Sequence, residues 1–279
     1  MISNFKGKTA VLTGAGSGFG LACARIGAKL GMNLVLVDVQ KDALDAAEAE
    51  LKATGVAVMA RLVNVSDAAQ MQALANDVKA TFGAPNFVFN NAGVAAGGLV
   101  WESSLADWEW VMGVNLWGVV HGVRLFTPMM LEAAKADPAY QGHIVNTASM
   151  AGLLNAPNMG IYNVSKHAVV ALSETLYQDL ALVTDQISAS VLCPYFVPTG
   201  ITRSERNRPN VPKDMKLTRS QLIGQAMTDK KTYWLVDATG AKALVEGVEE
   251  RDRWSLHGWT EAADPVRDEM VWVQHEQTQ

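Results

Sequence analysis

Residues 9–20 read TAVLTGAGSGFG, and this stretch decides the fold. The apolar run Thr9–Thr13 is too short for a helix, so it predicts a strand that is covered on both faces. A glycine-rich turn, Gly14–Gly20, follows and leads into a helical segment. Glycines let a backbone approach a phosphate closely, and the first turn of a helix offers free N–H groups and a favourable dipole. The stretch therefore predicts a strand, a phosphate-binding turn and a helix.

The turn fits the pattern T-G-x-x-x-G-x-G through Gly14, Gly18 and Gly20, with Ser17 and Phe19 as its other candidate cofactor contacts. A carboxylate is expected about 20 residues further on, where it accepts hydrogen bonds from the adenosine ribose and repels a 2′-phosphate. Asp38 ends the second apolar run. No basic residue replaces it, so the sequence favours NAD, with NADP as the less favoured cofactor. A tight turn with packing glycines is the structural alternative.

The remaining pattern alternates short apolar runs with longer amphipathic ones. The other predicted strands are Asn33–Val37, Val56–Val63, Phe87–Asn90, His143–Thr147 and Ile187–Cys193. The predicted helices are Lys41–Ala53, Asp67–Thr81 with Ser66 as its N-cap, Asp107–Lys135 and Tyr162–Val183. This alternation predicts right-handed βαβ units and a doubly wound (Rossmann) α/β fold. We expect a parallel sheet of about seven strands, with helices on both faces, in a single domain over residues 1–279.

The regular pattern weakens after Pro194. Residues 199–218 are rich in Arg, Lys and Pro, and we expect them to form a flap on the substrate side. A helix is expected near Ala238–Glu250, followed by a strand at Arg253–His257 and a terminal helix after Pro265.

Composition narrows the function classes. The net charge is −5 and 49% of residues are hydrophobic, so no basic footprint for a nucleic acid is present. No apolar run reaches the ~18 residues of a membrane span. The cysteines, Cys23 and Cys193, are far apart and form no metal-binding pattern. The first residues lack the apolar core of a signal peptide. We therefore expect a cytoplasmic protein with no metal, no nucleic acid and no membrane partner.

Tyr162 and Lys166 are four residues apart, so a helix would place them on one face, one turn apart. A nearby ammonium stabilises a phenolate and lowers the pKa of the tyrosine toward neutrality, where it can exchange a proton with an alcohol. Such a pair alone is weak evidence. Ser149 follows the fifth predicted strand, and Asn90–Gly93 ends the fourth, at the edge of the sheet where ligands bind in open α/β folds. Asn115 lies in the next predicted helix.

In this combination the sequence resembles the classical short-chain dehydrogenase/reductase family. The resemblance runs to about Pro194 and includes the glycine turn, Asp38, Asn91-Ala92-Gly93, Asn115, Ser149 and Tyr162-x-x-x-Lys166, in the family's order and spacing. It implies reversible hydride transfer between a nicotinamide cofactor and a secondary alcohol or ketone. It also implies a homodimer or homotetramer.

The resemblance also implies a role for each matching residue. Tyr162 would be the general acid/base, and Lys166 would lower its pKa and hold the nicotinamide ribose. Ser149 would hydrogen-bond the substrate oxygen. Asn115 would position a water in a proton relay through Lys166, and Asn91 would lie near the cofactor's ribose.

The sequence departs from the family at several positions. Asn64-Val65 stands where an Asp commonly contacts adenine, and an asparagine keeps that hydrogen bonding possible. Pro194 is followed by Tyr195 rather than by the usual glycine. Val197 and Thr199 remain where they could meet the nicotinamide carboxamide.

Apolar side chains after the fourth, fifth and sixth strands could form a substrate pocket, with core packing as the alternative: Trp101, Met150, Leu153, Met159, Tyr195 and Phe196. Such a pocket favours a bulky or aromatic secondary alcohol, with Ser149, Met150 and Tyr195 as substrate contacts. Arg203, Arg206 and Arg208 form either a solvated loop or a site for an acidic substrate group.

Three other functions are possible interpretations of the sequence. A nucleotide-sugar epimerase or dehydratase usually carries a different glycine spacing and a larger C-terminal domain. A non-catalytic redox regulator tends to lose the Tyr or Ser that this chain keeps. A methyltransferase-like loop would have no use for Tyr162. The apolar positions of the Tyr162 helix suggest burial against a partner copy as well as against the sheet.

Overall fold

The computed structural model describes residues 2, 4–195, 197 and 199–209, together with the backbone of 232–236, 242–246 and 272–273. Six parallel strands form its sheet: β1 (Thr9–Thr13), β2 (Asn33–Asp38), β3 (Val58–Leu62), β4 (Phe87–Asn90), β5 (Gly142–Thr147) and β6 (Ile187–Leu192). Their order is β3-β2-β1-β4-β5-β6, and the two-residue strand β9 (Trp272–Val273) pairs antiparallel with β6. The predicted parallel sheet is confirmed with six strands rather than about seven.

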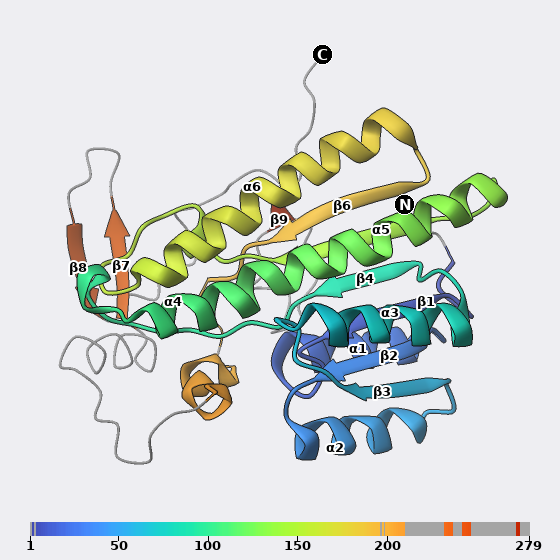
Figure 1. The fold of residues 1–279 in the computed structure, drawn as a ribbon, viewed down its shortest axis with the longest axis horizontal. Helices are drawn as coiled ribbons and strands as arrows, with labels where there is room; N and C mark the ends of the chain where they lie inside the picture. The colour runs from blue at the N-terminus through green and yellow to red at the C-terminus, as the bar shows by residue number, and fades with distance from the viewer. Residues whose placement is uncertain are drawn as a thin grey trace.

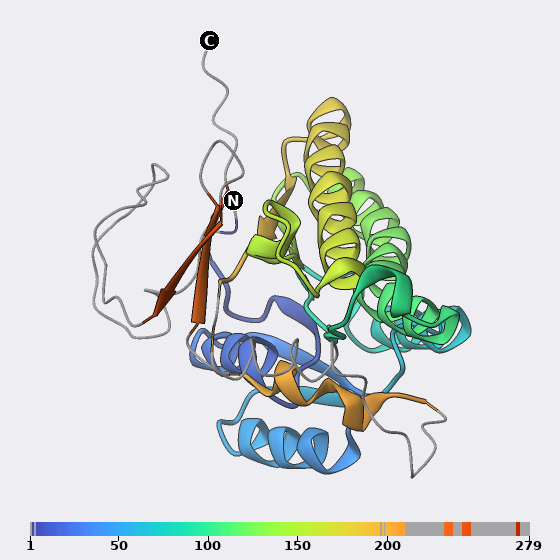
Figure 2. The ribbon, with the colours of Figure 1, turned by 90° about the vertical axis from the view of Figure 1, so that its left-hand side faces the viewer.

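Helices cover both faces of this sheet (Figures 1 and 2). The α-helices are α1 (Gly18–Lys29), α2 (Lys41–Lys52), α3 (Ala68–Phe82), α4 (Leu105–Met112), α5 (Gly118–Ala136) and α6 (Gly160–Val183). Short helical turns are η1 (Val100–Glu102), η2 (Gly113–Trp117), η3 (Met150–Gly152) and η4 (Gly200–Asn207). None of the helices in the described ranges is long and apolar enough to cross a membrane.

The core divides into two layers because successive strand residues point to opposite faces. Val11, Val35 and Val37 pack with side chains of α3 and α5, including Met71 and Phe126. The residues between them pack against α1 and α2 on the other face: Ala10, Leu12, Leu34 and Leu36 with Ala24, Ala28, Leu44 and Leu51. Both faces of the sheet are therefore buried, as the continuous apolar runs predict.

The start of α3 differs from the prediction by one residue. The N-cap of α3 is Asp67, whose Oδ1 accepts hydrogen bonds from the N–H groups of Ala69 and Gln70. Ser66 was expected in that role, but its N–H and hydroxyl both donate to Asn64 Oδ1. A carboxylate placed next to the first turn also suits the helix dipole.

Two of the elements predicted for the C-terminal part of the chain differ from the structure, and a third lies outside the described residues. The predicted helix near Ala238–Glu250 is wrong where it is described, because β8 (Lys242–Glu246) pairs antiparallel with β7 (Thr232–Val236). Pairing with a partner strand overrides local helix preference here. Likewise, β9 lies within the predicted terminal helix. The strand expected at Arg253–His257 lies outside the described residues.

Candidate active site

The glycine turn joins β1 to α1 at the carboxyl edge of the sheet. Gly14 adopts a φ of 67°, in the left-handed region. A Cβ at Gly20 would lie 2.1 Å from the carbonyl oxygen of Gly14, so any side chain there would push the turn apart. Ser17 is the N-cap of α1, yet its side chain makes no capping hydrogen bond. The turn therefore presents a hydroxyl and the first N–H groups of α1 to a ligand.

Asp38 ends β2 beside this turn and is 8% exposed. Its Oδ2 accepts the N–H of Gly16 at 2.9 Å, and its Oδ1 accepts the N–H of Gln40 at 2.9 Å. Two backbone donors thus hold the carboxylate in one orientation. Asp38 also lines the cavity described below, where the sequence expects it to meet a ribose.

Two threonines that the sequence analysis missed connect the strand ends. The Thr13 hydroxyl accepts the N–H groups of Asn91 and Ala92, at 2.9 and 3.0 Å. Asn91 Nδ2 donates to the Thr13 carbonyl oxygen, and Asn91 Oδ1 accepts from the Thr147 hydroxyl at 3.2 Å. This network joins β1, β4 and β5 where the strand order reverses, which is where ligands bind in such sheets. The position of both threonines as last residues of predicted strands was the available signal.

Tyr162 and Lys166 lie one turn apart near the start of α6, and both are buried. The Lys166 ammonium lies 5.6 Å from the centre of the Tyr162 ring, and its Nζ donates to the carbonyl oxygen of Thr147 at 2.8 Å. Ser149 follows β5 and hydrogen-bonds Tyr162. The structure therefore brings the three predicted catalytic side chains together.

The pKa shifts of Tyr162 and Lys166 in this structure differ from the shift that the sequence predicts for Tyr162. Burial raises the pKa of Tyr162 to about 12, although the hydrogen bond with Ser149 lowers it in part. Burial also lowers the pKa of Lys166 to about 8. Burial therefore opposes the expected lowering of the Tyr162 pKa by Lys166, because loss of solvent disfavours both the phenolate and the ammonium.

Asn115 lies in η2, a π-helical turn between α4 and α5, where the sequence predicts one continuous helix. It is fully buried. Its Oδ1 accepts the N–H of Val94 at 2.8 Å, and its Nδ2 donates to the Val94 carbonyl and to Ser165 Oγ. The Ser165 hydroxyl in turn donates to the carbonyl oxygen of Tyr162. Asn115 therefore fixes the loop after β4 to the helix that carries Tyr162, as single π-turns at functional sites often do.

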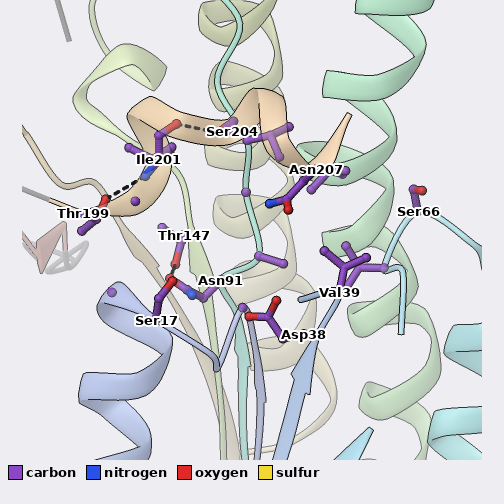
Figure 3. A pocket seen from close by; sticks show the side chains of 18 of the residues that line it. Ser17, Asp38, Val39, Ser66, Asn91, Thr147, Thr199, Ile201, Ser204 and Asn207 are labelled. Atoms are coloured by element: carbon purple, nitrogen blue, oxygen red, sulfur yellow. Dashed lines mark hydrogen bonds between the residues drawn. The ribbon is translucent and has the colours of Figure 1, made fainter. Parts of the chain in front are cut away.

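One cavity of about 810 Å³ extends from the glycine turn to Tyr162 (Figure 3). The predicted cofactor and substrate residues that line it are Gly14, Ser17, Gly18, Phe19, Asp38, Asn64, Val65, Asn91, Ala92, Gly93, Ser149, Tyr162, Lys166, Pro194, Tyr195, Val197 and Thr199. Gly20, Asn115 and Met150 do not line it. Gly20 packs against the turn, Asn115 is turned inward, and Met150 belongs to the short turn η3. No group of His, Cys, Asp and Glu suited to a metal occurs in the described part of the chain.

The expected apolar substrate wall is only partly present. Tyr195 lines the cavity, but Trp101, in η1, is 79% exposed. Leu153 and Met159 do not line the cavity, and Phe196 lies outside the described residues. Trp110 of α4 lines the cavity and was missed, since one helical position among several apolar ones carries no distinguishing signal.

Residues 199–209 lie across the cavity and include η4; residues 210–218 of the expected flap lie outside the described part. Ser204 holds η4 in place, because its buried hydroxyl accepts the N–H of Ala95 at 3.0 Å. Arg208 forms a buried ion pair with Asp107 and stacks over the ring of Trp110. The described flap is therefore docked against the loop after β4 and against α4.

Comparison with known proteins agrees with this geometry. The short chain dehydrogenase family matches residues 8–210. A crystal structure of a short chain dehydrogenase/reductase from Burkholderia phymatum, in complex with NAD, is 52% identical, covers 82% of this chain and 80% of its own, and has a TM-score of 0.77. Two other similar solved structures contain NADH and NADP.

Two characterised relatives are dehydrogenases by name. The CLA biosynthesis dehydrogenase/reductase of Lactiplantibacillus plantarum is 34% identical over 75% of this chain and 71% of its own length. The 1-deoxy-11-beta-hydroxypentalenate dehydrogenase of Streptomyces avermitilis is 32% identical over 92% of this chain and 95% of its own. With the parallel sheet, the glycine turn and the Ser149–Tyr162–Lys166 group in place, the chain belongs to the short-chain dehydrogenase/reductase family of oxidoreductases.

Proposed function

We propose that this protein interconverts a secondary alcohol and its ketone by hydride transfer, with NAD as the preferred cofactor and NADP as the less favoured one. One observation carries the proposal. The glycine turn, Asp38 and the group formed by Ser149, Tyr162 and Lys166 all line one continuous cavity. A dinucleotide site and a proton-transfer site within one cavity are what a hydride-transfer enzyme requires.

The residues present fit a nicotinamide dinucleotide. Ser17 and the start of α1 suit a pyrophosphate, since they offer a hydroxyl and free N–H groups. Asp38 suits ribose hydroxyls, because it is an accepting carboxylate held in place by two backbone donors. The cofactor, when bound, supplies the hydride acceptor or donor.

The protein's own groups handle the oxygen and the proton. Ser149 and Tyr162 are hydrogen-bonded, so both hydroxyls can meet one substrate oxygen. Tyr162 takes the proton from the alcohol during oxidation and returns it during ketone reduction. A charged Lys166, 5.6 Å from the ring, stabilises the phenolate once the proton has moved. Asn115 keeps its proposed part in the proton relay, although its side-chain amide is engaged with Val94 and Ser165.

An apolar, bulky substrate suits this cavity. Tyr195, Val94 and Trp110 contribute apolar walls around the polar group. Aromatic walls bind apolar or aromatic bodies and leave the oxygen to the polar residues. We therefore propose a bulky or aromatic secondary alcohol, with Tyr195 as the candidate for shaping its site, since Met150 does not line the cavity.

The test compares Tyr162→Phe with Tyr177→Phe. Both tyrosines lie on α6, but Tyr177 packs against the core and does not line the cavity. We expect Tyr162→Phe to lower kcat by roughly 10²- to 10⁴-fold, because it removes the proton-transfer group. Dissociation constants for NADH should stay within about threefold. Tyr177→Phe should leave kcat and the dissociation constant for NADH near the wild-type values.

Initial rates are measured on aliphatic, cyclic, aromatic and acidic alcohols, with NAD and NADP side by side. Wild-type turnover by Tyr162→Phe would refute the proposed mechanism. NADH binding with no turnover on any alcohol would favour a non-catalytic dinucleotide regulator. A preference for NADP of more than about tenfold would contradict the role given to Asp38.

We also propose the binding partners of the protein and its cellular compartment. A small alcohol or ketone is the expected partner, with no nucleic acid and no membrane. A cytoplasmic location is supported by two cysteines that are both free thiols, one of them buried.

A further inference from the structure

The described flap brings an arginine to the ribose end of the cavity. Helix η4 crosses the cavity from Thr199, on the side of α1, to Asn207, on the side of β2 and Ser66 (Figure 3). Arg206, near its end, is separated from β2 by more than 160 residues of sequence. Its Nε nevertheless donates to Gln40 Oε1 at 2.8 Å.

Gln40 is also the residue that holds Asp38. Its N–H donates to Asp38 Oδ1 at 2.9 Å, while its side chain accepts from Arg206. Both Arg206 and Asp38 line the cavity. A positive side chain and a negative side chain therefore flank Gln40 at the place where the ribose of a bound dinucleotide is expected.

The charge of Arg206 is not neutralised by its contacts. Nη1 donates to the carbonyl oxygens of Gly200 and Arg203, so the three acceptors of this side chain are all neutral. Within the described ranges no carboxylate forms an ion pair with Arg206. Arg208, two residues on, is paired with Asp107 and Glu205. Arg206 thus remains an available cation on the cavity wall, while Arg208 serves the docking of the flap.

We propose that Arg206 is a cofactor-specificity residue, which allows this site to accept the 2′-phosphate of NADP in addition to NAD. The inference rests on the proposed function. Asp38 alone disfavours a 2′-phosphate, because its charge has the same sign. A guanidinium has a planar set of donors that matches phosphate oxygens and offsets that repulsion. If the Arg206 side chain moves from Gln40 to a phosphate, it exchanges a hydrogen bond to a neutral acceptor for one to a charged acceptor.

The test measures dissociation constants of NADH and NADPH by nicotinamide fluorescence at fixed ionic strength, using the full chain. The variants are Arg206→Ala and Arg206→Gln. Arg203→Ala is the matched control, because Arg203 lies on the same helix, is exposed and does not line the cavity. We expect both Arg206 variants to weaken NADPH binding by about tenfold or more, and NADH binding by less than about threefold. Arg203→Ala should change neither.

The outcomes separate this inference from its alternatives. An equal loss of NADH and NADPH binding in Arg206→Ala would mean that Arg206 only anchors the flap, which overturns the inference. The same holds if wild-type protein binds NADH but no NADPH, or if Arg206→Ala matches Arg203→Ala. Failure of the wild-type protein to bind either dinucleotide would overturn the proposed function as well.

Discussion

Burial is the strongest influence on the residues that are expected to move a proton. It raises the pKa of Tyr162 to about 12 and lowers the pKa of Lys166 to about 8, so at neutral pH Tyr162 is protonated while Lys166 still carries most of its charge. A neutral tyrosine is the form that donates a proton to a ketone. At the residue scale, burial therefore favours the form of Tyr162 that ketone reduction uses at neutral pH.

This asymmetry predicts the pH dependence of the two directions. Alcohol oxidation needs deprotonated Tyr162, whose fraction rises about tenfold per pH unit below its pKa. We expect kcat/KM for oxidation to rise with pH from about pH 6 and to rise less steeply above about pH 8, where Lys166 loses the charge that stabilises the phenolate. We expect kcat/KM for reduction to stay high at neutral pH, where Tyr162 is protonated. Both profiles are measured between about pH 6 and pH 10 with saturating cofactor. An oxidation plateau reached below pH 7 would contradict the effect of burial on Tyr162.

Residues that depend on local sequence were predictable, and residues that depend on tertiary contacts were not. Asp38 and Lys166 follow from their spacing to a strand end and to Tyr162. The sequence offered Arg206 only as part of a solvated loop or of a site for an acidic substrate group, and did not place it near Asp38, because its contact with Gln40 joins segments far apart in the chain.

At the scale of elements, the main departure is the break between α4 and α5. The sequence predicts one helix from Asp107 to Lys135, but the π-turn η2 interrupts it and turns Asn115 inward. A π-turn inserts one residue into the helical repeat, so the apolar periodicity of the two halves still resembles a single helix. Helix type and position were predictable here, and the break was not.

The ion pair between Arg208 and Asp107 docks the flap against α4, and its side chains are only 10% and 6% exposed. Asp107 also closes the capping box of α4 with Ser104. Arg208→Ala leaves this carboxylate buried without its partner, so we expect a loss of about 3 kcal/mol in unfolding free energy. Urea unfolding measures it, with Arg203→Ala as the exposed control. Equal stability of the two variants would show that the flap does not depend on this pair.

At the scale of the whole molecule, we propose that the protein associates as a homodimer or homotetramer. The apolar side chains of α6 that suggested a partner are largely accounted for within the subunit, because Val169, Val170 and Leu180 are buried. Exposed apolar side chains do remain at Trp117, at the end of η2, and at Val164 of α6. They are candidates for the contact surface of a homodimer or homotetramer.

Light scattering after size-exclusion chromatography tests this surface. We expect the wild-type mass to be two or four times the mass of one subunit. We expect Trp117→Lys to lower this mass, since a charge would be buried in the contact. Leu62→Lys is the matched control, because Leu62 and Trp117 are each 54% exposed. A monomeric wild-type protein, or equal masses for both variants, would contradict the proposed contact surface.

The strand order has a consequence for how the chain is made. β1 is synthesised before β2, β3 and β4, yet it lies between β2 and β4 in the finished sheet. One edge of β1 has no partner until Phe87–Asn90 has been synthesised, and β5 and β6 arrive later still. An apolar strand with an open edge is prone to pair with other chains. We therefore expect the growing chain to be open to pairing with other chains until β4 has been added to the sheet.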